Sequence, residues 1–389
     1  MDVGHDYLER VSALGPDIDR ASLDVDGTRD IPESLFAKLV DADLFRLLQP
    51  RAYGGAELDP LTFTRLIEDV GKHDASVGWC LCQNNVCAVI SAYLKPDAAK
   101  AMFKSPRDIL AWGPGPGEAK EVEGGFELSG KFDFASGSRH ATYLGAHVPI
   151  VDRSGARRLN DDGKPAILTM LFPKGEVEIK DTWHVIGLRG TGSDSFVADK
   201  LFVPHQRAVS RMLGAKKYVD GPLYGFSQSN LYSSGFASLA LGIARATVDE
   251  FVAVVKDTIP RGAPKPRREN NVVQSRVGQA EARIRSSRAF LRNSLEEIWA
   301  DVKTTGELSD EQQVTLRLAT TWAIQESREV VNSLYLAAGA LAIFESQPFE
   351  HRFRDIHTLC QQIQGHAAHF ETVGQILMGM EPDRSLFSF

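Results

Sequence analysis

The spacing of apolar residues predicts helices over residues 1–105. Ile31, Pro32 and Glu33 open one segment in which leucines return at helical spacing. Asp74 has the position of an N-cap before a longer helix. The apolar positions of that longer helix are Trp79, Val86, Val89 and Ile90. An N-terminal helical domain is therefore expected.

The apolar period changes to two after residue 125. Phe126, Leu128, Phe132 and Phe134 alternate with polar or charged residues, which is the pattern of a strand with one buried face. Further strand-like runs cover residues 146–151, 166–172 and 201–203. Turn-forming residues, such as Gly190-Thr191-Gly192, separate these runs. We expect a β domain, barrel-like in shape, over residues 106–212.

The helical period returns in residues 213–389 and predicts a C-terminal four-helix bundle. Three apolar stripes support this expectation. They consist of Ile284, Leu291, Leu295 and Ile298; of Val330, Val331, Leu334, Tyr335, Ala338 and Leu341; and of Ile363, Ala367, Phe370, Gly374 and Leu377. The proline-rich segment 260–268 between helices is expected to be an exposed loop. The chain is thus mainly α with a central β domain.

Composition and charge exclude several classes of protein. Forty-four Lys and Arg against 51 Asp and Glu give a net charge of −7, and no dense basic field suggests a nucleic-acid partner. No apolar run reaches the roughly 20 residues of a membrane span, and the N-terminus lacks the layout of a signal peptide. Four cysteines in a long chain are not a disulfide framework, so we expect a cytoplasmic protein.

Signatures of metal sites, nucleophile elbows and nucleotide loops are missing from the sequence. Cys80 and Cys82 form a C-x-C pair, whereas zinc ribbons need paired C-x2-C units, so no metal site is expected. No G-x-S-x-G or G-x4-G-K-[ST] motif occurs. The glycine-rich run 113–117 does not follow the dinucleotide fingerprint, which argues against a nicotinamide site in this chain.

Two segments of the middle domain carry candidate cofactor contacts. Trp112 and Gly113 precede the predicted strand that ends in Ser136-Gly137, and this segment resembles the β-domain flavin motifs of the acyl-CoA dehydrogenase superfamily. The resemblance implies that a strand-end hydroxyl bonds the N5 edge of a flavin and that an aromatic ring covers its face. The alternative is a plain strand ending in a Ser-Gly turn. The second segment, 187–195, offers the Arg189 guanidinium, the Gly190 backbone and the Ser193 hydroxyl to a phosphate or a flavin edge. Its alternative is a glycine-rich hairpin turn.

A third segment completes a resemblance to a known family. Ala338-Gly339 is followed by 348–357 (Pro-Phe-Glu-His-Arg-Phe-Arg-Asp-Ile-His) and by 361–374, which begins Gln-Gln-Ile-Gln-Gly-His. Together with the motifs above, these residues resemble the acyl-CoA dehydrogenase superfamily, and most closely its group D flavin monooxygenases, including those that oxidise indole-like aromatics. The resemblance spans residues 30–385. It implies the acyl-CoA dehydrogenase fold, with flavin between the β domain and the C-terminal bundle.

Two positions separate oxygenases from dehydrogenases within this resemblance. Many of the dehydrogenases carry a catalytic glutamate eight residues after the aspartate that matches Asp355, and that position is Ile363 here. Several phenol-hydroxylating relatives carry a histidine seven residues after the aspartate, and that position is Gln362. A dehydrogenase is therefore disfavoured and a simple phenol hydroxylase is in doubt. An indole has an electron-rich C3 and needs no deprotonation by a base.

The resemblance therefore implies the oxygenase component of a two-component monooxygenase. It implies reduced FAD or FMN, O2 as co-substrate, a C4a-hydroperoxide, a separate NAD(P)H:flavin reductase, a small aromatic substrate that is indole-like or phenolic, and a homotetramer built as a dimer of dimers. The rivals are an N- or S-oxygenase, for instance one acting on an amino-sugar, and a flavin-free binding or scaffold protein with the same fold. The expected catalytic residues are Ser136, Gln362 and His357; the expected cofactor contacts are Trp112, Gly113, Ser136, Gly137, Arg189, Gly190 and Ser193; and the expected substrate contacts are Gln83, Asn84 and Gln361. For His357 a structural role, such as pairing with Glu350, competes with catalysis.

Overall fold

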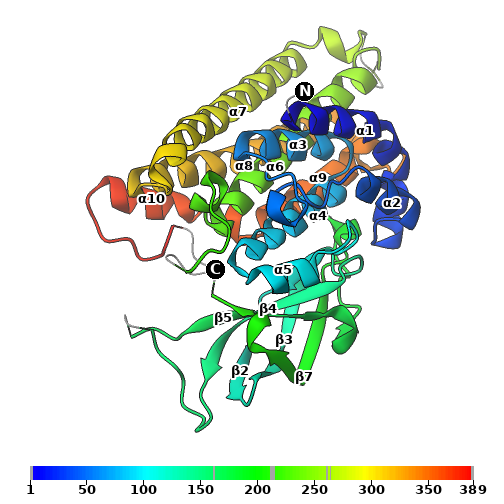
Figure 1. Cartoon of the computed structure of the whole chain (residues 1–389). Coiled ribbons are helices and arrows are strands. Elements are labelled where there is room, and N and C mark those ends of the chain that lie inside the picture. The colour runs from blue at the N-terminus through cyan, green and yellow to red at the C-terminus, as the bar shows by residue number, and fades with distance from the viewer. Residues whose placement is uncertain (1–2, 161–162, 211–214, 260–261, 263, 387–389) are drawn as a thin grey trace.

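The chain folds into a helical part and a sheet part that lie against each other (Figure 1). The computed structural model describes residues 3–160, 163–210, 215–259, 262 and 264–386. The α-helices are α1 (Val3–Thr28), α2 (Glu33–Asp41), α3 (Pro60–His73), α4 (Ala75–Ala88), α5 (Pro96–Met102), α6 (Gln228–Val255), α7 (Asn271–Thr305), α8 (Asp310–Ala338), α9 (Pro348–Cys360) and α10 (His369–Leu377). The strands are β1 (Leu110–Gly113), β2 (Gly117–Val122), β3 (Gly125–Ala135), β4 (Tyr143–Val151), β5 (Ile167–Pro173), β6 (Glu178–Lys180), β7 (Asp194–Pro204) and β8 (Ala208–Val209).

The N-terminal helices begin where the sequence signals predict. Pro32 precedes the first residue of α2, and the Asp74 carboxylate accepts a hydrogen bond from the Val77 amide at 2.8 Å, which caps α4. The same carboxylate accepts a bond from the Ser22 hydroxyl of α1 at 2.7 Å. Asp74 therefore caps the N-terminus of α4 and also fixes α1 relative to α4. Almost every side chain of α4 is buried, because α3, α6 and β1 all pack against this helix.

The strands in the described residues form one eight-stranded, mostly antiparallel sheet. Its order is β6-β7-β3-β2-β4-β5-β8, with β1 paired in parallel to β4. Phe126, Leu128 and Phe132 are buried as the alternation predicts, but the expectation for Phe134 is wrong: its side chain is 61% exposed. The β3–β7 register shifts between Phe132 and Ala135, and Phe134 has a φ of +60°. This bulge turns one residue out of the alternation.

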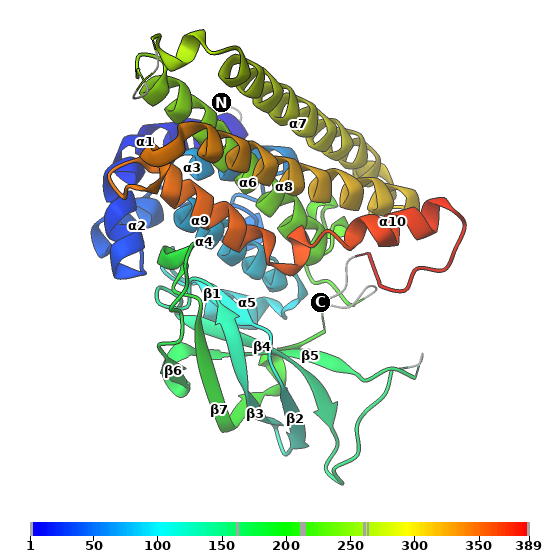
Figure 2. The same ribbon diagram turned by 180° about the vertical axis from the view of Figure 1, so that it is seen from behind.

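The C-terminal helices pack around α6 (Figure 2). Most residues of α6 are buried. The first predicted stripe lies buried on α7, and the second lies on α8 as far as Ala338. The third stripe does not form one helix. A 3-10 turn, η9 (Ile363–Gly365), precedes α10, and both Ile363 and Leu377 are exposed. The predicted helix is interrupted here: α9 ends at Cys360, and the Gln362 side chain caps η9.

The predicted order of a helical, then a β, then a helical part is confirmed. Helices precede residue 103, strands occupy residues 110–209 and helices resume at residue 228. The expected boundary between residues 105 and 106 falls between α5 and β1, and the one between 212 and 213 lies outside the described residues. Two segments bring the two parts together: α4, which contacts β1 and α6, and the loop around residues 186–193, which contacts α1, α4 and α9.

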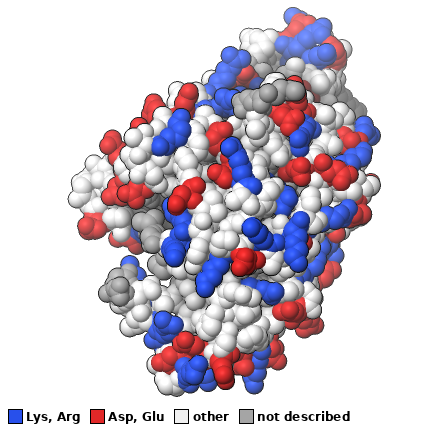
Figure 3. All heavy atoms as spheres, viewed as in Figure 1, with Lys and Arg blue, Asp and Glu red and all other residues white. Residues whose placement is uncertain are grey.

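The surface carries both signs of charge. On the face shown in Figure 3, Lys and Arg side chains are interspersed with Asp and Glu and do not gather into one basic field. None of the helices in the described residues is long and apolar enough to cross a membrane.

Candidate functional site

The strand-end serine predicted to contact a cofactor lies where the sheet meets α4. Ser136 is 5% exposed, and its Oγ accepts a hydrogen bond from the indole Nε1 of Trp79 at 2.9 Å. A second partner, the Ser193 hydroxyl, lies 2.7 Å from the same oxygen. Thr191 follows at 2.6 Å from Ser193 and donates to the Leu188 carbonyl at 2.8 Å. Three hydroxyls from two strand-end loops thus form one continuous buried chain.

Gly137 is required next to this serine for two reasons. Its φ is +74°, which costs a residue with a side chain about 1–2 kcal/mol. In addition, a Cβ there would lie 2.4 Å from the Oδ1 of Asn84 on α4. Asn84 is 2% exposed, and its Nδ2 donates to the carbonyls of Leu110 and Ser136 at 3.0 and 3.4 Å. The amide predicted to bind substrate therefore fastens β1 and the end of β3 to α4.

Gly190 is explained by close packing. A Cβ there would lie 2.1 Å from Cγ1 of Val25, so only glycine lets the loop approach α1. The neighbouring Arg189 donates to the carbonyls of Asp26 and Val185, at 3.0 and 3.2 Å. The Arg189 guanidinium therefore forms its hydrogen bonds with α1 and with its own loop. Of the three cofactor contacts predicted in this segment, Arg189 and Gly190 lie outside the hydroxyl chain and Ser193 lies in it.

Trp112 and Gly113 lie on β1, inside the sheet packing. The Trp112 ring is 4% exposed and meets His147 edge-on at a centroid distance of 4.7 Å. Gly113 lies so close to β3 that a Cβ would overlap the Asp133 carbonyl. An aromatic side chain that is more accessible at the same end of the sheet is Phe134, whose ring meets Trp183 at 6.1 Å. The bulge that exposes Phe134 leaves no signal in the apolar alternation, so sequence reasoning missed it.

Aromatic rings from α4 and α6 form a wall beside Ser136. Trp79 stacks on Phe236 with a centroid distance of 4.0 Å, and Phe236 is parallel to Tyr232 at 5.7 Å. Gln83, the half-buried amide of α4, donates from Nε2 to the Tyr232 hydroxyl at 3.1 Å. The structure therefore brings Gln83, Trp79 and Ser136 onto the same side of α4. Because Trp79 and Ser136 are 57 residues apart in the chain, the sequence pattern did not indicate this contact.

The predicted residues of the C-terminal helices lie at the end of α9. Gln362 accepts the Gln364 amide at 2.7 Å, and Gln361 is exposed. His357 lies one turn earlier and contacts Asn332 through Nε2 at 2.7 Å. Burial, with a smaller contribution from Arg328, lowers the pKa of His357 and favours its neutral form. The contact between His357 and Asn332 connects α9 to α8, and Gln362 caps η9; neither of these contacts includes the hydroxyl chain.

The loop at residue 188 is anchored by a buried carboxylate from α9. Asp355, 1% exposed, accepts the Leu188 amide at 2.7 Å, while Leu188 itself has a φ of +51°. Burial raises the pKa of Asp355, and the His351 ring 3.2 Å away opposes that shift. A further close contact reinforces the anchor, since a Cβ at Gly187 would overlap the Arg354 carbonyl.

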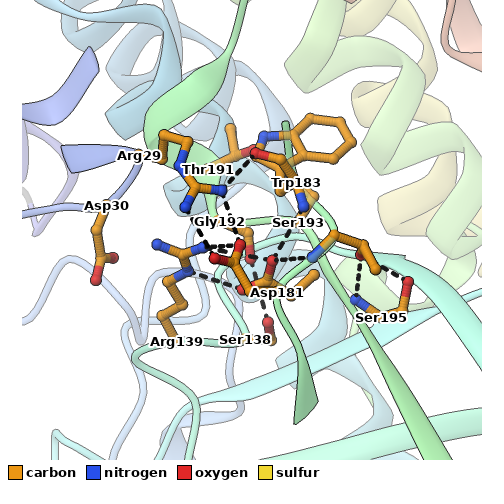
Figure 4. Close-up of polar contacts among 12 residues, drawn as sticks. Arg29, Asp30, Ser138, Arg139, Asp181, Trp183, Thr191, Gly192, Ser193 and Ser195 are labelled. Carbon is orange, nitrogen blue, oxygen red and sulfur yellow. Dashed lines mark hydrogen bonds and ion pairs between the residues drawn. The ribbon is translucent and has the colours of Figure 1, made fainter. Parts of the chain in front are cut away.

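Ion pairs that sequence reasoning did not predict hold the other side of this loop (Figure 4). Arg29 forms a bidentate pair with Asp181 at 2.7 and 2.9 Å, and Arg139 pairs with the buried Asp194 at 2.8 Å. Both guanidinium groups point toward Asp181 in Figure 4, and the second is 3.3 Å from it. Arg29 is the main cause that lowers the pKa of Asp181 to about 2. No sequence motif marks these residues, because the pairs join segments that are far apart in the chain: the residue after α1, the β3–β4 loop and the β6–β7 segment.

The donor groups of the site fit an organic cofactor. Across the described part of the chain, no three His, Cys, Asp or Glu side chains are grouped to hold a metal ion. All four cysteines are free and buried, and burial raises the pKa of the Cys80 thiol. Beside its contacts with Trp79 and Ser193, the Ser136 hydroxyl can form one more hydrogen bond, which suits a flavin N5 edge. Two surface hollows, of about 440 Å³ at Tyr7 and Arg10 and about 190 Å³ at Tyr93 and Tyr218, are not lined by the predicted site residues.

Comparison with protein families matches both helical parts. Residues 17–103 match the acyl-CoA dehydrogenase N-terminal domain model, and residues 234–369 match the C-terminal domain model. The two models together cover more than half of the chain.

Similar proteins with assigned activities are oxygenases. The indole-3-acetate monooxygenase of Pseudomonas putida is 28% identical over 94% of this chain and 92% of its own length. The flavin-dependent monooxygenase oxygenase subunit HsaA of Rhodococcus jostii (strain RHA1) is 23% identical over 90% of this chain and 92% of its length. Among solved structures, XiaF from Streptomyces sp., in complex with FADH2 and glycerol, superposes with a TM-score of 0.90 at 22% identity, covering 99% of this chain and 98% of that one.

Proposed function

The chain belongs to the acyl-CoA dehydrogenase family and is the oxygenase component of a two-component flavin-dependent monooxygenase, and we propose that its substrate is an electron-rich, indole-like aromatic. Reduced FAD or FMN and O2 are its co-reactants, and a separate reductase supplies the reduced flavin. The indole-3-acetate monooxygenase similarity, which spans nearly the whole chain, supports this class of substrate.

The observation that carries the proposal is the aromatic wall beside Ser136. Trp79 donates to the serine that is predicted to contact flavin and stacks on Phe236, which in turn lies parallel to Tyr232, so stacked rings from α4 and α6 extend away from Ser136. Planar aromatic ligands gain binding energy from such surfaces, about 0.5–1.5 kcal/mol per ring pair beyond area burial. A substrate held against this wall would lie next to the reactive edge of the flavin.

The polar groups beside this wall fit an indole better than a substrate that must be ionised. Gln83, Tyr232 and Cys87 contribute an amide, a phenol and a thiol, which bond to one another at 3.1–3.6 Å. An amide oxygen can accept the N–H of an indole without a proton transfer. The position that holds a histidine in several phenol-oxidising relatives is Gln362, so deprotonation of a phenol would lack that base.

Each predicted site residue keeps a proposed role. Ser136 would bond the flavin at N5, Ser193 would hold Ser136, and Gly137, Gly190 and Gly113 would let the backbone approach. The remaining contacts proposed for the cofactor and the substrate are Trp112, Arg189, Gln361, Gln362, His357, Gln83 and Asn84. When bound, reduced flavin supplies the electrons with which O2 is activated. The chain itself excludes water and orients the substrate.

The test is incorporation of labelled oxygen into an aromatic substrate. The protein, a generic NADH:flavin reductase and FAD or FMN are incubated with indole or indole-3-acetate under ¹⁸O₂, and the product is analysed by mass spectrometry. We expect one ¹⁸O atom per product and no product without the oxygenase. A parallel incubation with 4-hydroxyphenylacetate compares a phenol. Oxidation of the phenol alone would contradict an indole-like substrate, and consumption of O2 without any labelled product would contradict the monooxygenase assignment for these substrates.

A homotetramer, built as a dimer of dimers, is proposed from the apolar side chains of the C-terminal helices. Leu336, Ile343, Phe344, Leu377 and Met378 are each more than half exposed, and such surface is usually covered by another subunit. Light scattering after gel filtration tests this proposal, with Leu336→Asp as the interface variant. A monomeric mass for the unaltered protein would contradict it.

A cytoplasmic location is proposed on the basis of four free, buried cysteines. Cell fractionation tests this location, and recovery of the protein outside the cytoplasmic fraction would contradict it.

A further inference from the structure

We propose that the buried hydroxyl chain Ser136–Ser193–Thr191 is oriented in one direction, that it makes Ser136 a hydrogen-bond acceptor, and that the protein thereby selects reduced over oxidised flavin. This inference rests on the proposed function, because it concerns the same flavin contact. Ser193 and Thr191 become positioning residues that act through Ser136. Nothing in the apolar pattern or in the motifs of the sequence indicates this role for Thr191.

The direction of the chain follows from its far end. The Leu188 carbonyl accepts only, and it lies 2.8 Å from the Thr191 Oγ1. Two oxygens at that distance without a hydrogen between them repel each other, so the Thr191 hydrogen points to Leu188. Thr191 then has only lone pairs for Ser193, 2.6 Å away, and Ser193 must donate to it. Ser193 in turn has only lone pairs for Ser136, at 2.7 Å, so Ser136 donates to Ser193.

The near end of the chain is fixed by Trp79. An indole N–H is a donor with no acceptor lone pair, so Trp79 occupies one lone pair of the Ser136 oxygen at 2.9 Å. The Ser136 hydrogen is already used toward Ser193. What remains on this oxygen is one lone pair. Both serines and Thr191 are at most 5% exposed, so bulk water does not compete for these bonds.

A lone pair at this position distinguishes the two redox forms of flavin. Reduced flavin carries a hydrogen on N5 and donates it, whereas N5 of oxidised flavin has a lone pair and only accepts. Ser136 therefore forms a hydrogen bond with the reduced form and faces the oxidised form with two acceptors in opposition. An oxygenase that receives reduced flavin from another protein and releases oxidised flavin after turnover benefits from this preference.

Removing the Thr191 hydroxyl reverses the chain. In Thr191→Val the Ser193 hydrogen loses its acceptor, and the Ser136 oxygen is the remaining acceptor in the hydroxyl chain, at 2.7 Å. Ser193 then donates to Ser136, whose own hydrogen turns outward and suits oxidised flavin. The Leu188 carbonyl stays bonded to the Trp183 indole N–H at 3.0 Å, so the substitution leaves no orphaned carbonyl. Valine also has nearly the shape of threonine.

The experiment measures the ratio of dissociation constants for oxidised and reduced FMN, and in parallel for FAD. Anaerobic titrations with dithionite-reduced flavin and aerobic titrations with oxidised flavin are followed by calorimetry. We expect the unaltered protein to bind the reduced form more tightly and Thr191→Val to lower the oxidised-to-reduced Kd ratio about three- to tenfold, the effect of one hydrogen bond. Ser193→Ala, which also frees the Ser136 hydrogen, should lower the ratio to a similar extent.

Two control variants separate orientation from general damage. Thr182→Val removes a neighbouring hydroxyl that bonds Ser195 at 2.8 Å, in a chain that ends on Asp133 and does not reach Ser136, so the ratio should not change. Thr191→Ser keeps the hydroxyl donor at this position and should therefore have the wild-type ratio. Structural damage would weaken the binding of both redox forms together and leave the ratio unchanged.

The outcomes distinguish this inference from the proposed function. If the protein binds reduced flavin but the Kd ratio is the same in Thr191→Val, Ser193→Ala and wild type, the oriented chain is refuted and the oxygenase assignment stands. If the unaltered protein binds neither reduced FMN nor reduced FAD, the proposed function fails and the inference fails with it.

Discussion

Replacing Gly137 with alanine tests how the β domain is fastened to α4. The new Cβ would lie 2.4 Å from the Asn84 Oδ1, so the Asn84 side chain must move. Displacement breaks its bonds to the carbonyls of Leu110 and Ser136, each worth about 1 kcal/mol. The φ of +74° adds about 1–2 kcal/mol for alanine in the left-handed region. We expect Gly137→Ala to lower the free energy of unfolding by about 3–4 kcal/mol.

Gly155→Ala is the matched control. Gly155 also has a positive φ, +93°, but a Cβ there meets nothing within 4 Å. Its substitution therefore incurs only the backbone cost of about 1–2 kcal/mol. Urea unfolding of both variants and of the unaltered protein, at one protein concentration and followed by tryptophan fluorescence and circular dichroism, gives the two differences. Equal destabilisation by the two substitutions would refute the contact with Asn84 as the source of the extra cost.

Three further outcomes follow from charged groups. Arg29 lowers the folded-state pKa of Asp181 to about 2, so the stabilisation from Asp181 is complete above its unfolded pKa of about 4 and is lost as the pH falls toward 2. The difference in unfolding free energy between wild type and Asp181→Asn should therefore disappear as the pH falls from about 4 to 2. A difference that stays constant would contradict the pairing. Burial lowers the folded-state pKa of His369 to about 4, so stability should fall as the pH drops from about 6.5 to 4, and an NMR titration that finds its pKa near 6.5 would contradict this. Glu68, 4% exposed, pairs with two arginines of α7 at 2.6 and 2.8 Å. Glu68→Gln should lower the free energy of urea unfolding by about 1–2 kcal/mol, a moderate amount because those arginines are partly solvated. An unchanged unfolding midpoint would show that the pairs add nothing to stability.

Local signals in the sequence were sufficient to predict the class of fold. Asp74 caps α4 and the Phe126–Phe132 alternation lies on β3, because caps and periodicity depend on residues close in the chain. The same periodicity failed at Phe134 and at Ile363. A bulge and a helix break are set by tertiary packing, and in both cases the apolar pattern continues through the irregularity.

The site was predicted less completely than the fold. Ser136 and Gly137 were predicted from the family motif to contact flavin, which stays a prediction; the structure shows that Ser136 bonds Trp79 and that Gly137 lies against Asn84. Trp79 was expected only as an apolar position of a helix, and the ion pairs of Arg29 and Arg139 were not expected at all. These contacts join segments that are distant in sequence, so a single sequence without aligned homologues contains no record of them.

The bond between the Leu188 amide and Asp355 forms late in the synthesis of the chain. The two residues are 167 positions apart, and Asp355 belongs to one of the last helices of the chain. The loop that holds Ser193 and Thr191 leaves the ribosome long before its anchor is made. A growing chain can fold its N-terminal helices and its sheet, but the Leu188 amide has no Asp355 to bind until α9 has emerged. The last contact of this loop therefore forms only when synthesis of the chain is nearly complete.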